Sequence, residues 1–540
     1  MEAFDYVIVG AGTAGCVVAS RLAADGRHRV LLLEAGGSDR RPYIQLPIGY
    51  GRLLFDPRSN WMYETEAEPA LAGRRGFWPR GKVVGGSGSI NALLYVRGLP
   101  SDFDEWQALG NPGWGYQDVL PYFLKSEDHG SDAGPNHGRG GPMHVTDVSA
   151  DAHPLCQLYL KSCEALGFRY TADFNGAAGE GVGIYQINTR RGRRASTANE
   201  FLRPALTNAN LVLRQRAQAT RVLFEGRRAA GIEFLRGGRR CQVAANRAVV
   251  LCGGSINSPQ LLQLSGVGNS VLLQSLGIRV VTDLPGVGQN LQDHLAVSYF
   301  YNSSRPTLND QFNSLAGKIK VGLQYLLHRR GPLAMSVNQG GGFVRSDASQ
   351  RTPNLQLYFN PVSYTQTPLA DRKLLRPDPF SAFLLSFNSC RPSSRGSLKI
   401  TSPDPMVHPR IEPNYLATDR DLADALAGCR LLRQLSATPP LSQVITGEIQ
   451  PGLEVRSDAE LLQDFRSRSS TVYHPVSTCT MGPDPRSAVV DARLRVHGLK
   501  DLWIVDSSVF PTITSGNVNA PTVMVAEKGA ELILQDGGAG

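Results

Sequence analysis

The stretch Phe4-Asp5-Tyr6-Val7-Ile8-Val9-Gly10-Ala11-Gly12-Thr13-Ala14-Gly15 decides the fold of this 540-residue chain. A short apolar run leads into three glycines at a fixed spacing, and a helical pattern over residues 13–24 follows. The first glycine allows a tight turn, the second lets the backbone approach a pyrophosphate, and the third lets helix and strand pack closely. The N–H groups at the helix N-terminus favour a phosphate there. The pattern predicts a nucleotide-binding βαβ unit.

The segments that follow extend this unit into a larger sheet. Residues 30–33 form a second apolar run, and Glu34 ends it, 19 positions after Gly15, where a carboxylate can accept from ribose hydroxyls. Further buried strands are predicted at 248–252 and 502–505. We therefore expect an α/β chain with a doubly wound sheet.

The part of the chain between 305 and 463 has a different pattern. Runs rich in strand-forming residues at 355–359, 380–387 and 396–401 predict an antiparallel sheet, typical of a separate substrate-side layer. A helix near 312–328 carries one apolar stripe, made of Leu315, Ile319, Leu323, Leu326 and Leu327. We expect this helix to cover the sheet, and a helix lying on a membrane surface is the alternative.

Composition limits the class of protein. Hydrophobic residues make up 41% and charged residues 19%, which excludes wholesale disorder, and the length favours two domains. The net charge is +9, but arginine pairs such as Arg193-Arg194 are scattered and no nucleic-acid motif accompanies them. We expect a solvated basic surface and no nucleic-acid partner. The eight cysteines are dispersed without a CxxC pair, which favours a reducing compartment, and Cys16 and Cys252 are expected to be buried.

The glycine fingerprint alone does not identify the nucleotide cofactor. Two further segments, both rich in small residues, distinguish between the candidates. The segment 81–91 (GKVVGGSGSIN) lets backbone lie against a flat ligand, with Asn91 free to form hydrogen bonds. In the segment 254–268 (GSINSPQLLQLSGVG) we expect Ser258 to cap a helix, Pro259 to lie in its first turn and Gly266 to end it.

These two segments resemble the signature patterns of the glucose–methanol–choline (GMC) oxidoreductases, and so do the segments 474–482 (HPVSTCTMG) and 516–522 (GNVNAPT). The resemblance runs from residue 5 to about 535 and is nearest to the choline-dehydrogenase-like and alcohol-dehydrogenase-like branch. It departs at Gly88, where many relatives have serine. It implies FAD, a Rossmann-type domain and a substrate domain built on a six-stranded antiparallel sheet with helices.

The resemblance also implies a division of the chain and a set of cofactor contacts. We expect an FAD-binding domain made of 1–155, 196–304 and 464–540, and a substrate-binding domain made of 156–195 and 305–463. No metal site is expected. The expected cofactor-binding residues are Gly10, Gly12, Thr13, Ala14, Gly15, Glu34, Ala35, Trp61, Val84, Gly86, Ser87, Asn91, Ala92, Leu94, Val222, Tyr473, Asp506, Ser507, Asn519, Pro521 and Thr522.

His474 is the candidate catalytic base. An alcohol releases hydride readily once its hydroxyl proton is removed, and histidine works as a base near neutral pH. His474 precedes a proline in a loop of small residues and matches the family's catalytic histidine. Asn517 is expected to orient the substrate oxygen and Asn519 to contact the flavin, with the reverse assignment open. A helix over 521–535, with Pro521 at its first position, would place positive potential at the flavin.

The expected reaction is FAD-dependent oxidation of an alcohol, with a primary alcohol going to its aldehyde by proton abstraction and hydride transfer to flavin N5. Electrons then pass to a quinone, another electron carrier or O2. The alternatives are a hydroxynitrile-lyase-like or fatty-acid-photodecarboxylase-like member of the same fold, an NAD-dependent dehydrogenase and a binding protein with a dead site. Trp61 and Tyr63 leave a quaternary ammonium substrate open.

The expected location is cytoplasmic, with peripheral attachment to the inner face of the membrane as an option. The chain starts almost directly with a strand and shows neither a signal-peptide pattern nor an apolar run long enough to span a bilayer.

Overall fold

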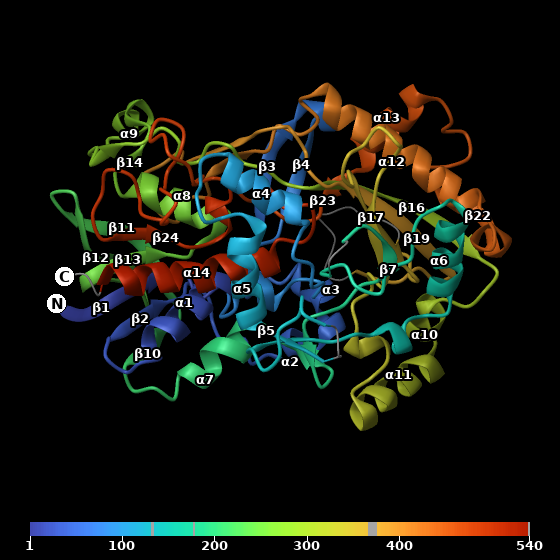
Figure 1. The fold of residues 1–540 in the computed structure, drawn as a ribbon, viewed down its shortest axis with the longest axis horizontal. Helices are drawn as coiled ribbons and strands as arrows, with labels where there is room; N and C mark the ends of the chain where they lie inside the picture. The colour runs from blue at the N-terminus through green and yellow to red at the C-terminus, as the bar shows by residue number, and fades with distance from the viewer. Residues whose placement is uncertain (131–133, 177–178, 365–374, 538–540) are drawn as a thin grey trace.

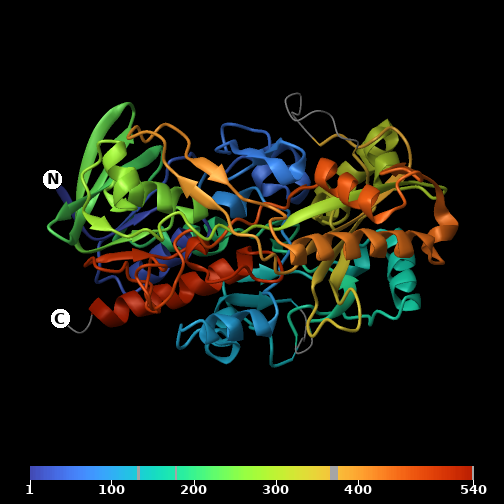
Figure 2. The ribbon, with the colours of Figure 1, turned by 90° about the horizontal axis from the view of Figure 1, so that it is seen from above.

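Two sheets side by side organise the computed structural model, which describes residues 1–130, 134–176, 179–364 and 375–537 (Figure 1). Both chain ends lie at the outer side of the first sheet, as Figures 1 and 2 show. Each sheet has its own large cluster of buried apolar side chains. Among the described residues, no helix is long and apolar enough to cross a membrane.

The first sheet has the predicted doubly wound core. Strands β10, β2, β1, β13 and β24 pair in parallel, and β12 and β11 extend the sheet by antiparallel pairing. Parallel strands are buried on both faces, which explains the unbroken apolar runs. The bounds are β1 Glu2–Val9, β2 Val30–Leu33, β10 Leu211–Arg214, β11 Ala217–Glu225, β12 Arg228–Arg236, β13 Arg239–Leu251 and β24 Leu502–Ile504.

Helices cover this sheet, and α1 and α8 begin just after the carboxyl ends of β1 and β13. The helix α1 packs along α14, which in turn contacts α5, and α8 packs against β11. The expected helix over 13–24 and the strands at 30–33, 248–252 and 502–505 are confirmed, as is the burial of both named cysteines. The bounds are α1 Thr13–Ala23, α5 Tyr116–Ser126, α8 Gly254–Leu264 and α14 Asn519–Gly537.

The second sheet is antiparallel throughout, and a path of six strands is joined by the short β23 on β16. The helix α12 packs on β19, and α6 contacts β7 and β17. The strand β16 belongs to this sheet, although the sequence partition assigns its residues to the FAD-binding part. The bounds are β7 Gly181–Ile184, β16 Leu295–Ser303, β17 Gly340–Val344, β18 Leu355–Asn360, β19 Ala382–Ser389, β22 Ile445–Gln450, β23 Ser470–Thr471, α6 Leu155–Ala165, α12 Asp419–Ala437 and α13 Asp458–Arg468.

The expectations at 355–359 and 380–387 are confirmed by β18 and β19. The run at 396–401 forms β20 (Ser397–Lys399), which pairs with β21 (Arg410–Glu412) in a separate two-stranded sheet and not in the main sheet.

The expected cap of α8 was wrong. The helix begins at Gly254, so Pro259 lies inside it, and the Ser258 hydroxyl donates to Asp506 Oδ2 over 2.6 Å. Proline cannot donate to the carbonyl four residues before it. Here the Thr478 hydroxyl donates to that carbonyl, of Ser255, over 2.6 Å and replaces the missing bond. The end of α8 at Gly266, with φ +86°, agrees with the prediction.

The expectation that the apolar stripe of 312–328 covers the sheet was also wrong. The segment forms two helices, α10 (Leu308–Asn313) and α11 (Leu315–His328), separated by Ser314, whose hydroxyl accepts from Gly317 N over 3.1 Å. The only side chain of α11 that is buried is Val321, and the stripe itself faces outward.

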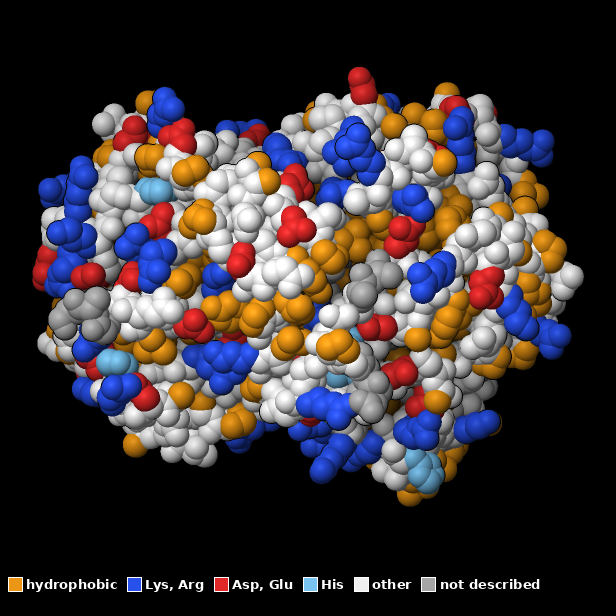
Figure 3. All heavy atoms as spheres, viewed as in Figure 1, with side chains coloured by type: hydrophobic (Ala, Val, Ile, Leu, Met, Phe, Trp, Pro, Cys, Tyr) orange, Lys and Arg blue, Asp and Glu red, His pale blue; other side chains and the backbone are white. Residues whose placement is uncertain are grey.

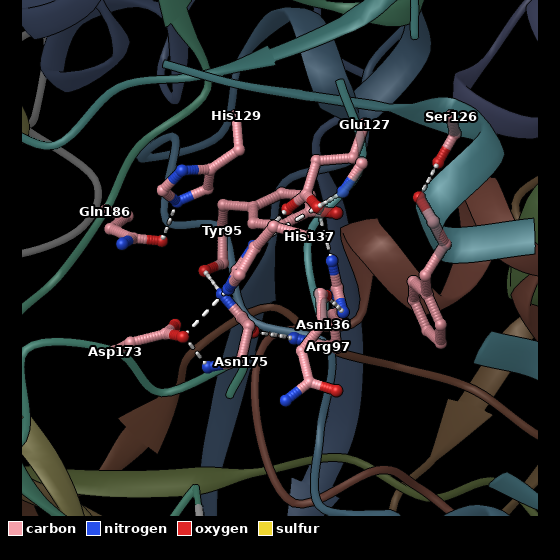
Figure 4. A network of polar contacts seen from close by, with 12 residues as sticks. Tyr95, Arg97, Ser126, Glu127, His129, Asn136, His137, Asp173, Asn175 and Gln186 are labelled. Atoms are coloured by element: carbon pink, nitrogen blue, oxygen red, sulfur yellow. Dashed lines mark hydrogen bonds and ion pairs between the residues drawn. The ribbon is translucent and has the colours of Figure 1, made fainter. Parts of the chain in front are cut away.

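A buried ion network lies where β5 (Glu127–His129) meets the loop after it (Figure 4). Arg97 binds Glu127 Oε2 over 2.5 Å, and His137 lies between Glu127, at 3.2 Å, and Asp173, at 2.8 Å. Burial opposes the charge of His137, but the hydrogen bonds to Asp173 and Glu127 outweigh it and raise its pKa to about 9. The network therefore holds this loop through charge.

Candidate active site

A cavity of about 420 Å³ opens where the two sheets meet. The carboxyl ends of β1, β2 and β13 line one part of it, through Val9, Leu33 and Leu251. The second sheet lines the other part, mainly through Ser298, Phe300, Tyr358, Asn360, Leu384 and Ser386. Ligands of open α/β sheets bind beyond the carboxyl ends of the strands, so this position is the expected one for a nucleotide cofactor.

The glycines of the first turn leave room only for backbone. A Cβ on Gly10 would lie 2.5 Å from the Cys252 carbonyl oxygen, at a φ of +97° that disfavours side chains. A Cβ on Gly15 would lie 1.9 Å from the Gly10 carbonyl oxygen, so this glycine serves helix–strand packing. Gly12 lines the cavity at the N-terminus of α1, where backbone N–H groups favour a pyrophosphate.

The neighbouring acidic and polar groups fit the rest of a dinucleotide. Glu34 lines the cavity and accepts from Ala11 N over 2.9 Å and from Gly36 N over 2.7 Å; each carboxylate oxygen can accept a further bond, such as one from a ribose hydroxyl. Burial raises the pKa of Glu34 to about 7, against these two hydrogen bonds. The Thr13 hydroxyl donates to Asn519 Oδ1 over 2.9 Å and ties α1 to α14. The residues present therefore fit FAD.

The structure brings most of the predicted cofactor residues together. Four of them do not line the cavity: Gly15 packs against the first turn, Val84 lies in the apolar core, Pro521 lies within the first turn of α14, and Val222 donates its N–H to Ser265 Oγ. On β11 the cavity instead reaches Ala217, Gln218 and Ala219. The predicted residues that line it are Gly10, Gly12, Thr13, Ala14, Glu34, Ala35, Trp61, Gly86, Ser87, Asn91, Ala92, Leu94, Tyr473, Asp506, Ser507, Asn519 and Thr522.

Arg194 is a site residue that sequence reasoning missed. Its arginine pair was expected on a solvated surface, but its side chain is 1% exposed. It donates to Asn91 Oδ1 over 2.6 Å, to the Asn91 carbonyl over 2.8 Å and to the Gly88 carbonyl over 3.1 Å. Burial lowers its pKa to about 9. Arg194 thus fixes the small-residue segment that lines the cavity.

His474 and Asn517 meet at the cavity wall, as predicted from sequence. Asn517 Nδ2 lies 3.0 Å from His474 Nε2, and both residues line the cavity. On the other side of the ring, His474 Nδ1 lies 3.0 Å from His294 Nδ1. His294 Nε2 lies 2.9 Å from the Cys390 carbonyl oxygen.

These contacts determine which nitrogen of each ring carries the proton. A carbonyl only accepts, so His294 carries its proton on Nε2 and presents an unprotonated Nδ1. Burial lowers the pKa of His294 to about 4 and keeps it neutral. His474 must then donate from Nδ1, which leaves its Nε2 as an acceptor facing Asn517 and the cavity.

Burial keeps the ring of His474 neutral as well. Burial, with smaller contributions from His294 and Arg80, lowers the pKa of His474 well below the usual 6.5. An unprotonated imidazole nitrogen at a cavity wall is the form that a general base requires.

The backbone at His474 is held on both sides. Asp293 Oδ1 accepts from His474 N over 2.8 Å, and Asp293 Oδ2 accepts from the hydroxyls of Thr471 and Tyr415, each over 2.5 Å. Tyr473 has a left-handed φ of +70°, and its carbonyl accepts from Arg80 over 2.6 Å. A left-handed residue without glycine is costly and persists where its surroundings enforce it.

Trp61 and Tyr63 do not form a cage together. Trp61 lines the cavity, and Lys82 lies over its ring. Tyr63 is 1% exposed, belongs to the apolar cluster of the second sheet and is not among the residues that line the cavity.

Comparisons with known proteins cover nearly the whole chain. The N-terminal and C-terminal GMC oxidoreductase family models match residues 4–296 and 392–526. Mouse mitochondrial choline dehydrogenase is 42% identical, over 98% of this chain and 89% of its own. The alcohol dehydrogenase [acceptor] of Pseudomonas putida is 40% identical, over 98% and 96%. The crystal structure of pyridoxine 4-oxidase from Mesorbium loti superposes with a TM-score of 0.88 at 31% identity, over 98% of both chains.

Proposed function

Because this chain belongs to the GMC oxidoreductase family, we propose that it oxidises an uncharged primary alcohol to the aldehyde with His474 as the base. The resemblance noted in the sequence is confirmed, as are FAD as the cofactor and the class of enzyme, an FAD-dependent oxidoreductase acting on CH–OH donors. FAD, when bound, accepts the hydride that the alcohol carbon releases.

The observation that carries the proposal is the fixed tautomer of His474. Its Nδ1–H is directed to His294 and its unprotonated Nε2 faces the cavity, so a hydroxyl placed there donates its proton to Nε2. Asn517 Nδ2 donates into the same space and is proposed to hold the substrate oxygen. Asn517 Oδ1 lies 3.4 Å from Gln356 Nε2, which orients the amide with Nδ2 toward His474.

The cavity wall near His474 favours a neutral, largely apolar substrate. The second sheet contributes the aromatic side chains Phe300 and Tyr358 and the apolar Leu384. Two arginines, Arg80 and Arg468, line the cavity near His474. Asp464 neutralises Arg468 with two bonds of 2.5 and 2.6 Å, and Arg80 donates to the Tyr473 carbonyl. A quaternary ammonium group would find no carboxylate among the described residues here, which argues against choline.

The N-terminus of α14 is proposed to favour negative charge in the cofactor part of the cavity. Asn519 and Thr522 of its first turn line the cavity, and the 19-residue helix directs its N–H groups there. Asn519 is bound to Thr13, which supports assigning Asn517 rather than Asn519 to the substrate.

The proposed electron acceptor is a quinone, another electron carrier or O2, and the proposed location is the cytoplasm or the inner face of the membrane. A panel of primary alcohols with an artificial dye acceptor, run beside an oxygen electrode, identifies both substrate and acceptor class. Dye reduction without oxygen uptake supports a dehydrogenase.

The decisive test of the base is anaerobic stopped-flow. In His474→Ala the rate of flavin bleaching by the alcohol should fall about 10²–10⁴-fold, the usual range for a general base, while FAD stays bound. Asn517→Ala should cost less, because it removes a single hydrogen bond. An unchanged bleaching rate in His474→Ala would remove this residue from the mechanism.

A further inference from the structure

The helix α11 is amphipathic, but its apolar stripe faces outward and its other side faces the protein. Its apolar stripe is exposed, with Leu315 at 76%, Ile319 at 54%, Leu323 at 51%, Leu326 at 66% and Leu327 at 71%. These positions recur every three or four residues and so share one side of the helix. A water-facing helix normally presents polar side chains on this side, so the exposed stripe indicates an apolar partner.

The opposite side of α11 is the one that packs on the protein. Val321 is 3% exposed there. On the same side, a Cβ on Gly317 would lie 2.3 Å from the Gln311 carbonyl oxygen, so the helix sits close against α10. The orientation of α11 is therefore fixed by its inner face, and the outward stripe is not a consequence of loose packing.

The charges of α11 suit an anionic surface. Lys318 and Lys320 are exposed at the two borders of the stripe, and neither forms an ion pair with another described residue. The helix sequence LAGKIKVGLQYLLH contains no Asp or Glu. His328 is the last residue of the helix, and Arg329 follows it. In the view of Figure 3, the lower right part of the molecule, where Figure 1 places α11, shows hydrophobic, basic and histidine side chains together.

We propose that α11 binds the molecule to a lipid bilayer that contains anionic headgroups, with the stripe immersed in the interface and Lys318 and Lys320 at the headgroups. Interfacial helices combine an apolar face with flanking basic residues in this way. This proposal goes beyond the oxidation of the alcohol and does not depend on it.

A second copy of this chain fits the stripe less well. Two such helices packed on each other would bring four unpaired lysines together without a carboxylate from either helix. A helix of 14 residues is only about 21 Å long and, alone, buries less than the roughly 800 Å² per partner of a stable interface.

A short segment of chain links α11 to the cavity lining. The chain runs from α11 through the short helix η6 (Pro332–Ala334) to Val337 and Asn338, which line the cavity. The chain thus reaches the cavity lining nine positions after the end of α11.

The test is co-sedimentation of the full-length holoenzyme with vesicles of phosphatidylcholine alone or mixed with phosphatidylglycerol in equal parts. The wild type should bind the mixed vesicles, and less so at high salt. Leu326→Asn/Leu327→Asn should lower the binding at least about tenfold, and Lys318→Glu/Lys320→Glu should lower it on the mixed vesicles.

Val271→Asn/Leu453→Asn is the matched control, because these residues are 74% and 61% exposed and lie outside α11. It should bind like the wild type, and all variants should keep the turnover of a water-soluble alcohol with a soluble dye. The proposal is overturned if the wild type stays in the supernatant, or if the α11 variant sediments as the wild type does. It is also overturned if sedimentation velocity shows a wild-type dimer that the α11 variant dissociates, because α11 would then cover a second copy.

Discussion

Replacing His294 tests whether this neighbouring ring determines which nitrogen of the base, His474, carries the proton. In His294→Leu the Nδ1–H of His474 loses its acceptor at 3.0 Å. The imidazole of His474 is then free to move its proton to Nε2, the atom that must be vacant to take a proton from the alcohol. His294→Asn is the conservative comparison, because its Oδ1 stands where His294 Nδ1 stood and still accepts.

The expected loss in the rate of flavin bleaching follows from the burial of His294 and His474. His294 is fully buried and His474 is 8% exposed, so water does not replace the lost acceptor. A buried donor without a partner costs about 1–3 kcal/mol. At roughly 1.4 kcal/mol per factor of ten, the rate of flavin bleaching should fall about 5–150-fold in His294→Leu. His294→Asn should stay within a few-fold of the wild type.

The assay is anaerobic stopped-flow at saturating alcohol, with the flavin absorbance of each purified variant as the control for cofactor content. A double-mutant cycle separates positioning from general damage. In a His474→Ala background, His294→Leu should have no further effect, because no imidazole remains to be oriented. A wild-type rate in His294→Leu, or an equal loss in both backgrounds, would refute the reasoning.

Three further outcomes are expected. The bleaching rate should stay on its plateau as the pH falls to 6.5 and decline only at lower pH, because His474 works unprotonated and its pKa is lowered well below 6.5; a decline that begins above pH 7 in the pH profile contradicts this. His137→Gln should lower the free energy of unfolding by roughly 1–3 kcal/mol near pH 6. The pKa of His137 is raised, so the stabilisation that its charge provides is complete below pH 6.5 and is lost as the pH rises through about 9. The Tm values of variant and wild type should therefore differ at pH 6 and converge above pH 9. A difference in Tm that stays constant with pH would show another cause. Gly10→Ala should give colourless protein by absorbance because its Cβ meets the Cys252 carbonyl, whereas Gly37→Ala, with open space around its Cβ, should stay yellow.

Local patterns predicted the strands β1, β2, β13 and β24 of the first sheet and one half of the site. The structure of residues 4–15 can be predicted from these residues alone, because the strand, the turn and the start of the helix lie within twelve positions. His474 and Asn517 were found because each lies in a compact segment with a recognisable order of residues.

The other half of the site depends on contacts that no local pattern contains. His294 is 180 positions from His474 in sequence, and nothing around it indicates which ring it will meet. Arg194 looked like a surface arginine because its buried acceptors, on Gly88 and Asn91, lie about a hundred residues earlier. For α11 the periodicity gave the helix and its stripe, but periodicity does not tell which side faces the protein.

The two histidines are attached to a pair of strands that are bonded to each other. His294 directly precedes β16, His474 lies three positions after the end of β23, and Leu295 pairs with Thr471 in this ladder. Their mutual distance is thus held in part by main-chain geometry, whereas side chains on β18 and β19 shape the cavity wall beside His474. Substitutions in that wall can therefore change which substrate is admitted while the two histidines keep their positions. Substrate specificity and proton abstraction can then be altered separately in this fold.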